Sequence, residues 1–105
     1  MTSRINRIFK ESNKKLVTFT TAGDPDIQTS IKIIEKILKN KCDIIEIGMP
    51  FSDPMADGPT IQLSSNRSIK SGTTINEIFS IAKKIRELED DIPIILMGYY
   101  NIVFN

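Results

Sequence analysis

The sequence contains no histidine, only one cysteine (Cys42) and no long apolar run. Without histidine, metal sites built on imidazole and nucleophiles activated by histidine are excluded within these 105 residues. A single cysteine excludes an intramolecular disulfide, and we expect Cys42 to pack as a small hydrophobic residue where a strand begins. No segment approaches the roughly 20 apolar residues that span a bilayer, and the N-terminus lacks the apolar run of a secretory signal. A cytoplasmic protein without membrane contact is therefore expected.

An excess of charge of either sign is also missing. The 14 basic and 13 acidic residues give a formal net charge of +1, so electrostatics offers no case for a nucleic-acid partner. Hydrophobic residues make up 40% of the chain and charged residues 26%, which is typical of a globular protein. We expect a folded domain.

Alternating helices and strands are indicated by the spacing of the apolar residues. Short β-rich segments predict three strands, at Leu16–Thr20, Cys42–Met49 and Ile94–Gly98. A short amphipathic cap helix is expected over Arg4–Glu11. Three further helices are expected to follow Asp24, Gly58 and Thr74.

Several residues indicate where these helices begin and end. Asp24 is expected to be the N-cap of the second helix, with Pro25 at its first helical position. Asn40 is expected to take the left-handed position after this helix. Thr74 and Glu77 fit a capping box at the start of the fourth helix. A core-facing stripe is expected on the second helix, formed by Ile27, Ile31, Ile34 and Leu38.

This order of elements predicts an α/β fold with parallel strands joined by right-handed crossovers. Three parallel strands alone leave both outer edges unpaired, and a parallel sheet is normally covered on both faces. A complete (β/α)₈ TIM barrel needs about 250 residues. We therefore expect residues 1–105 to be the N-terminal part of a single TIM-barrel domain: a cap helix and the first three β/α units, truncated after the third strand.

Glu46 interrupts the apolar strand Cys42–Met49 near its C-terminal end. Because side chains alternate along a strand, Glu46 shares a face with Ile44 and Gly48. The C-terminal ends of barrel strands are where active sites are built, so Glu46 is a candidate acid/base residue. The equally weighted alternative is a structural glutamate paired with a Lys or Arg elsewhere.

The segment from Gly48 to Pro59 holds three prolines and two glycines and is expected to be a rigid, shaped loop. Its two acids, Asp53 and Asp57, are either functional or ordinary turn formers and helix caps. The segment does not fit a calcium-binding loop, since Met55 stands where an oxygen ligand is needed. The chain contains no glycine-rich phosphate-binding motif, and no metal site is expected.

The segment IEIGMPFSDPMADGPTIQ resembles, nearly position by position, the segment that identifies tryptophan synthase α chains. TTAGDPD after the first strand and MGYYNIVFN after the last are also similar to that family. The resemblance covers the chain from Leu16 onward. It implies a lyase of tryptophan biosynthesis, which cleaves indole-3-glycerol phosphate to indole and glyceraldehyde 3-phosphate by a retro-aldol reaction.

The resemblance also implies roles for individual residues. Glu46 would be the acid/base and Asp57 would hydrogen-bond the indole N–H. Substrate contacts would come from four further residues: Phe19, Ile61, Met97 and Tyr99. Two loop residues would face the partner β chain of an α₂β₂ heterotetramer: Pro50 and Asp53. No cofactor is expected in this chain, because pyridoxal phosphate belongs to the β chain.

Three other interpretations fit the sequence. The chain could be a non-catalytic fragment that keeps only the β-chain contact surface. It could also be another phosphate-handling barrel enzyme, although those lack a strand glutamate followed by a PFSDPxADG loop. A third alternative is a small open-sheet binding domain that is complete as it stands. Because the family's phosphate-binding part is not in these 105 residues, we expect the isolated chain to be inactive.

Overall fold

The computed structural model describes residues 3–11, 13–51 and 58–98. Within them, three strands form one parallel sheet in the order β1-β2-β3. The elements, in chain order, are α1 (Arg4–Ile8), β1 (Val17–Thr21), α2 (Ile27–Lys39), β2 (Ile44–Gly48), α3 (Pro59–Lys70), α4 (Ile75–Leu88) and β3 (Ile94–Met97). Every predicted element is present, and the parallel pairing is confirmed. The cap helix is shorter than expected, since it ends at Ile8.

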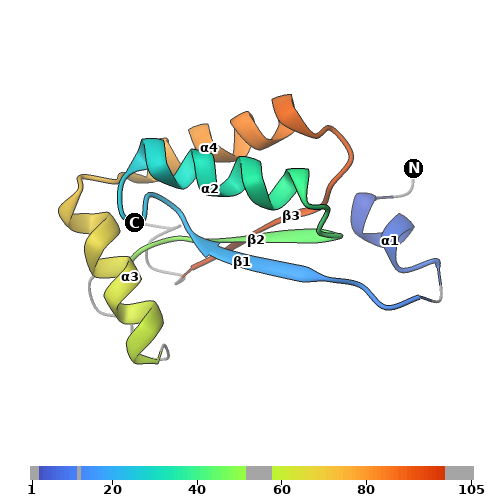
Figure 1. Cartoon of the computed structure of the whole chain (residues 1–105), viewed down its shortest axis with the longest axis horizontal. Coiled ribbons are helices and arrows are strands. Elements are labelled where there is room, and N and C mark those ends of the chain that lie inside the picture. Colours follow the sequence, from blue (N-terminus) through green and yellow to red (C-terminus); the bar gives the residue numbers. More distant parts are fainter. Residues whose placement is uncertain (1–2, 12, 52–57, 99–105) are drawn as a thin grey trace.

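Helices α2 and α4 lie side by side over one face of the sheet (Figure 1). The core fills the space between them and the strands, and it is made largely of isoleucine. Its central members are Ile34 of α2, Ile45 and Ile47 of β2, and Ile81 and Ile85 of α4, each at most 2% exposed. The predicted stripe on α2 is confirmed, because Ile27, Ile31 and Leu38 pack against this core beside Ile34. Cys42 is half-buried at its edge.

Three expectations about the ends of α2 are wrong. Pro25, expected at the first helical position, comes before the N-cap. The N-cap is Asp26, whose carboxylate accepts a hydrogen bond from the Thr29 amide at 2.8 Å. Asp24 does not cap the helix because its carboxylate is bound by Arg67 of α3. At the other end Asn40 has a φ of −92° and donates its side-chain amide to the Lys36 carbonyl, so the left-handed residue is Lys41, with a φ of 62°.

The predicted start of α3 at Gly58 and Pro59 and the predicted capping box of α4 are confirmed. Helix α3 begins with Pro59 after Gly58, which is its N-cap. Thr74 and Glu77 form the predicted capping box of α4, in which each side chain accepts a hydrogen bond from the other residue's backbone amide. These caps fix the two helices that follow β2, and α3 is the one that lies near the candidate site.

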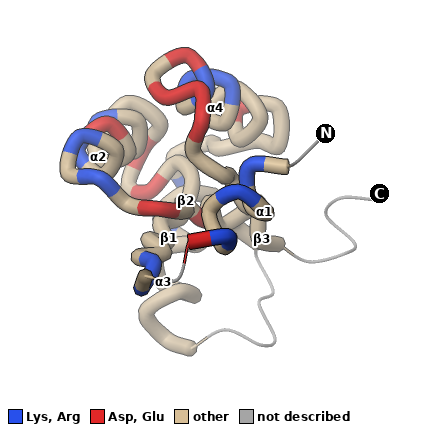
Figure 2. Tube along the Cα trace, turned by 90° about the vertical axis from the view of Figure 1, so that its right-hand side faces the viewer, with Lys and Arg blue, Asp and Glu red and all other residues tan. Residues whose placement is uncertain are grey.

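The two ends of the sheet carry different helices. Helix α1 lies at the end where the strands begin, and α3 lies at the end where they finish (Figure 1). Arg4 and Arg7 of α1 bind Asp90 and Asp91, which precede β3. Basic and acidic positions are interspersed along α2 and α4 (Figure 2). No helix in the described ranges is long and apolar enough to span a membrane.

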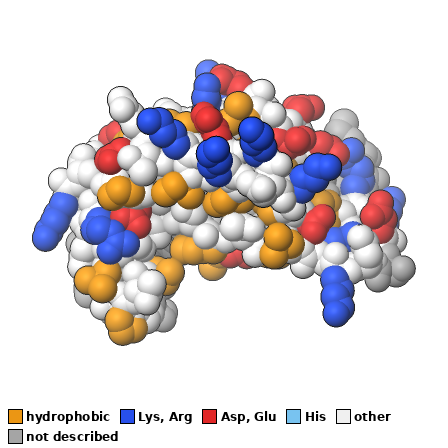
Figure 3. All heavy atoms as spheres, in the orientation of Figure 1, with side chains coloured by type: hydrophobic (Ala, Val, Ile, Leu, Met, Phe, Trp, Pro, Cys, Tyr) orange, Lys and Arg blue, Asp and Glu red, His pale blue; other side chains and the backbone are white. Residues whose placement is uncertain are grey.

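The sheet face opposite α2 and α4 carries apolar side chains that are partly exposed. Val17 and Phe19 of β1 and Met97 of β3 are 43%, 38% and 46% exposed. In Figure 3, charged side chains gather over the helices at the top, while hydrophobic ones lie along the sheet and over α3 below. We refer to this sheet face as the open face.

Candidate active site

Glu46 lies in the middle strand and on the open face. Its neighbours in the sheet register are Phe19 of β1 and Ile95 of β3, so apolar residues flank it on both sides. The residues before and after it, Ile45 and Ile47, are fully buried on the helix side. This alternation follows from the pleat of the strand and turns the carboxylate away from the core.

The Glu46 side chain is half-buried. Within the described part of the chain, no hydrogen bond or ion pair reaches its carboxylate. Partial burial of a carboxylate among apolar neighbours costs free energy unless the charge is paired or hydrogen-bonded. The alternative was that Glu46 forms a structural ion pair with a Lys or Arg. Among the described residues, Glu46 has no such partner.

Phe19 and Gly48 form a close contact beside Glu46. A Cβ built on Gly48 would lie 2.6 Å from Cζ of the Phe19 ring, well inside van der Waals contact. The ring of Phe19 therefore rests on the backbone of β2, two residues after Glu46. Met97 pairs with Gly48 in the register and so belongs to the same face. The structure thus brings Phe19, Glu46 and Met97 together on the open face.

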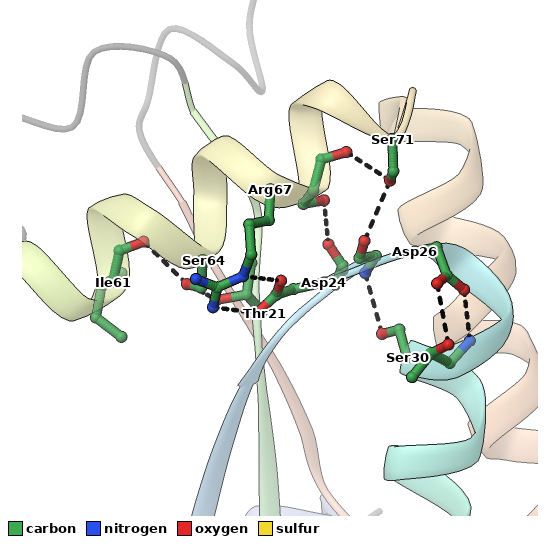
Figure 4. A network of polar contacts seen from close by, with 12 residues as sticks. Thr21, Asp24, Asp26, Ser30, Ile61, Ser64, Arg67 and Ser71 are labelled. Atoms are coloured by element: carbon green, nitrogen blue, oxygen red, sulfur yellow. Dashed lines mark hydrogen bonds and ion pairs between the residues drawn. The ribbon is translucent and has the colours of Figure 1, made fainter.

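Ile61 lies in the first turn of α3, and this helix lies on the open-face side of the sheet (Figure 1). Ile61 is half-buried, and its carbonyl accepts a hydrogen bond from the Ser64 hydroxyl at 2.9 Å. The same hydroxyl bonds the hydroxyl of Thr21, the last residue of β1, at 2.7 Å (Figure 4). Thr21 follows Phe19 by two residues and lies on the same face of β1. The first turns of α3 are therefore tied to the C-terminal end of the strand that carries Phe19.

Three of the remaining predicted site residues, Pro50, Asp53 and Asp57, lie between β2 and α3 in the sequence, and Tyr99 follows β3. Pro50 is half-buried just after β2. Asp53, Asp57 and Tyr99 lie outside the described residues. The alternative in which Asp57 is the N-cap of α3 is wrong, because Gly58 occupies that position. In the described ranges, no three His, Cys, Asp or Glu side chains are placed to hold a metal ion.

The polar residues that hold α3 were not predicted. Ser64 and Ser68 are buried against β1 and the loop after it, and Arg67 binds Asp24. A signal was present, since serines at positions 64, 68 and 71 recur at helical spacing. Serines at helical spacing usually lie on a solvent-exposed helix face, so this pattern alone only weakly indicates burial.

Comparison with known proteins decides the family. The family model described as tryptophan synthase alpha chain matches residues 5–105. The chain belongs to the tryptophan synthase α chain family. It is 57% identical over 95 residues to the α chain of Geotalea uraniireducens, covering 90% of this chain and 35% of that one. It is 48% identical over 103 residues to the α chain of Petrotoga mobilis, covering 98% and 39%.

Solved structures agree with this family assignment. An Aquifex aeolicus VF5 protein superposes with a TM-score of 0.93 at 41% identity, over 98% of this chain and 42% of that one. The tryptophan synthase α subunit of Legionella pneumophila gives 0.90 at 31% identity, over 99% and 41%. The chain thus spans well under half the length of its relatives. Its three parallel strands with their helices are consistent with part of the TIM barrel found in this family.

Proposed function

We propose that this chain contributes the first catalytic residues of a tryptophan synthase α chain, which cleaves indole-3-glycerol phosphate to indole and glyceraldehyde 3-phosphate. One observation carries the proposal. Glu46 places a half-buried carboxylate, unpaired within the described residues, on the open face between Phe19 and Ile95. Membership of the family gives that carboxylate a reaction to perform.

The retro-aldol reaction requires two proton movements. The indole ring carbon that leaves must gain a proton, and the side-chain hydroxyl must lose one as its carbon becomes the aldehyde. We assign the acid/base role to Glu46, since a carboxyl group can both give and take a proton when held beside the reacting bond. Positive charge develops on the indole nitrogen during cleavage. We assign its stabilisation to a hydrogen bond from the indole N–H to the carboxylate of Asp57.

Apolar residues around Glu46 suit an indole ring. Phe19 and Met97 expose part of their side chains on the open face, and Ile61 lies in the first turn of α3. We propose that these three residues and Tyr99 contact the substrate. Neither a metal nor an organic cofactor has a role in this proposal, because protonation and deprotonation alone complete the cleavage. Pyridoxal phosphate would belong to the partner β chain.

We also propose a β-chain partner and an α₂β₂ assembly. A related solved structure, 43% identical over 86% of this chain, is described as the tryptophan synthase complex from Pyrococcus furiosus. The partner surface would include Pro50 and Asp53, in the loop that follows β2 and precedes α3. The assembly would act in the cytoplasm.

The 105 residues would form the N-terminal part of one TIM-barrel domain. Both outer strands of the described sheet lack a second neighbour, and parallel edges of this kind are normally paired in a barrel. We expect the 105-residue chain alone not to release indole from indole-3-glycerol phosphate. Measurable release by that chain would contradict this part of the proposal.

The catalytic assignment is tested in a completed chain, in which residues 1–105 are followed by the remaining C-terminal part of the Geotalea uraniireducens relative. Glu46→Gln keeps the size of the side chain but cannot move protons as a carboxyl group can. Indole release should fall by at least about 10²-fold. The matched control is Glu35→Gln, a substitution of an exposed glutamate on α2, which should leave the rate unchanged.

Three outcomes separate the possibilities. Loss of activity in Glu46→Gln alone supports the assignment. Near-normal cleavage by Glu46→Gln would return Glu46 to a structural role. An inactive completed chain that still co-purifies with a β chain would favour the alternative of a non-catalytic contact surface.

A further inference from the structure

A cluster of polar side chains joins α3 to β1 and the loop that follows β1 (Figure 4). Its centre is a bidentate ion pair. The guanidinium of Arg67 donates from Nε to Oδ1 of Asp24 at 2.8 Å and from a terminal nitrogen to Oδ2 at 3.0 Å. The Asp24 side chain is only 18% exposed, whereas that of Arg67 is 54% exposed. Two parallel bonds fix the direction of both groups as well as their distance.

Two bonds between buried groups flank this ion pair. The Ser68 hydroxyl donates to the Ala22 carbonyl at 2.6 Å, and Ser68 is fully buried. One turn earlier, the Ser64 and Thr21 hydroxyls bond at 2.7 Å. The contacts of α3 thus run along one helix face, from residue 64 through 67 to 68. Small serine side chains on that face allow the helix to approach the strand end closely.

Helix α3 differs from α2 and α4 in what holds it. Its buried residues are all serines: Ser64, Ser65 and Ser68. It contributes no residue to the hydrophobic core defined by the described side chains, and its Leu63 is 58% exposed. Apolar packing is non-directional, whereas hydrogen bonds set orientation. The angle at which α3 meets the sheet is therefore set mainly by the polar cluster.

That angle matters because Ile61, a proposed substrate contact, lies in the first turn of α3. Ser64 bonds both the Ile61 carbonyl and Thr21, which lies two residues after Phe19 on the same face of β1. We propose that Asp24 and Arg67 are positioning residues that set α3 against the end of β1 and so place Ile61 beside the Glu46 face. The link to substrate binding rests on the function proposed above, but the link to α3 does not.

The first arm of the test needs no activity. Hydrogen–deuterium exchange is measured in the completed chain for the amides of residues 60–66. Asp24→Asn keeps the size of the side chain and removes its charge, so we expect exchange in these turns to accelerate at least about tenfold. Arg67→Lys keeps the charge but loses the bidentate geometry, and it should give a smaller acceleration of the same turns.

The matched control is Asp91→Asn. It removes the acid of an exposed ion pair, Arg7–Asp91, at the opposite end of the sheet. It should leave exchange in residues 60–66 unchanged. Unchanged exchange in Asp24→Asn, or equal acceleration in Asp91→Asn, would overturn the proposal.

The second arm uses the kinetics of indole release. If Asp24 positions a substrate contact, Asp24→Asn should raise KM at least about fivefold with a smaller change in kcat. The KM of Arg67→Lys should lie between those of the wild type and Asp24→Asn. A purely structural role would lower kcat in proportion to the unfolded fraction and leave KM unchanged, which would refute the link to substrate. An inactive wild-type completed chain would instead count against the proposed function, while the exchange arm would still decide whether Asp24 holds α3.

Discussion

The ring of Phe19 occupies the space that a side chain at Gly48 would need. A Cβ on Gly48 would lie 2.6 Å from Cζ and 3.0 Å from Cε2 of that ring. The two residues lie on neighbouring strands, on the face that carries Glu46. The absence of a side chain at position 48 thus leaves room for an aromatic ring on the face that carries the candidate acid/base.

Gly48→Ala tests this contact. The added methyl group must displace the Phe19 ring or the strand, so we expect the completed chain to lose about 1–3 kcal/mol of unfolding free energy, as overpacked sites do. Urea denaturation measures the loss. Phe19→Leu removes the ring atoms that clash, so Gly48→Ala should cost much less in that background. Equal costs in both backgrounds would show that the ring is not the obstacle.

Helix α2 shows how far local sequence predicts this fold. The isoleucines spaced by three and four residues predicted the buried face correctly, because helical periodicity is a local property. The start of the helix was predicted two residues too early. Asp24 and Asp26 are both suitable caps by type, and the pattern Asp-Pro-Asp does not decide between them. What decides is Arg67, which binds Asp24 from 43 positions along the chain.

The candidate site likewise has a part that the sequence predicted and a part that it did not. Alternation along β2 predicted that Glu46 and Gly48 share a face, and the register confirms it. The buried serines of α3 could not be predicted, because a serine stripe is buried only if matching polar groups face it. Those groups are Thr21 and the Ala22 carbonyl, which belong to a separate β/α unit.

Asp26 should make the stability of the chain depend on pH. The hydrogen bond from the Thr29 amide is the main cause that lowers the pKa of Asp26 below its ordinary value of 3.8. A lowered folded-state pKa means that the ionised cap stabilises the fold above the unfolded-state pKa and loses this effect as pH falls through the folded-state pKa. Asp26→Ala should therefore lower the urea midpoint at pH 7, and its difference from wild type should shrink below about pH 4.

Asp26→Asn is the control for that experiment. Asparagine can accept the same amide hydrogen bond but carries no charge. Its urea midpoint should lie between those of wild type and Asp26→Ala at pH 7, and the gap between the Asn and Ala variants should not change with pH. A gap between wild type and Asp26→Ala that is constant from pH 7 to pH 3 would contradict the ionised cap.

Ser68→Ala should destabilise the chain more than its small change in size suggests. The substitution leaves the Ala22 carbonyl without its 2.6 Å donor at a fully buried position, which costs about 1–3 kcal/mol. Ser71→Ala is the matched control, since Ser71 is exposed and water can replace its bonds to the Ser68 carbonyl at 2.9 Å and the Gly23 carbonyl at 3.4 Å. Urea denaturation of the completed chain should separate the two variants. Equal losses would mean that the bond to Ala22 contributes nothing beyond helix propensity.

Cys42 should react slowly with thiol reagents in the folded chain. Partial burial is the main cause that raises the pKa of its thiol above the ordinary value of 9.0. Because the thiolate is the reactive form, a raised pKa leaves less of it at pH 8 than an exposed cysteine would have. The rate of reaction with an aromatic disulfide should therefore be lower for the folded chain than for the same chain in urea. As pH rises above the pKa of the unfolded thiol, the rate for the folded chain should come closer to the rate in urea. Restricted access to the half-buried sulfur would account for any difference that remains. Equal rates at pH 8 would place Cys42 at an open surface instead of beside the core.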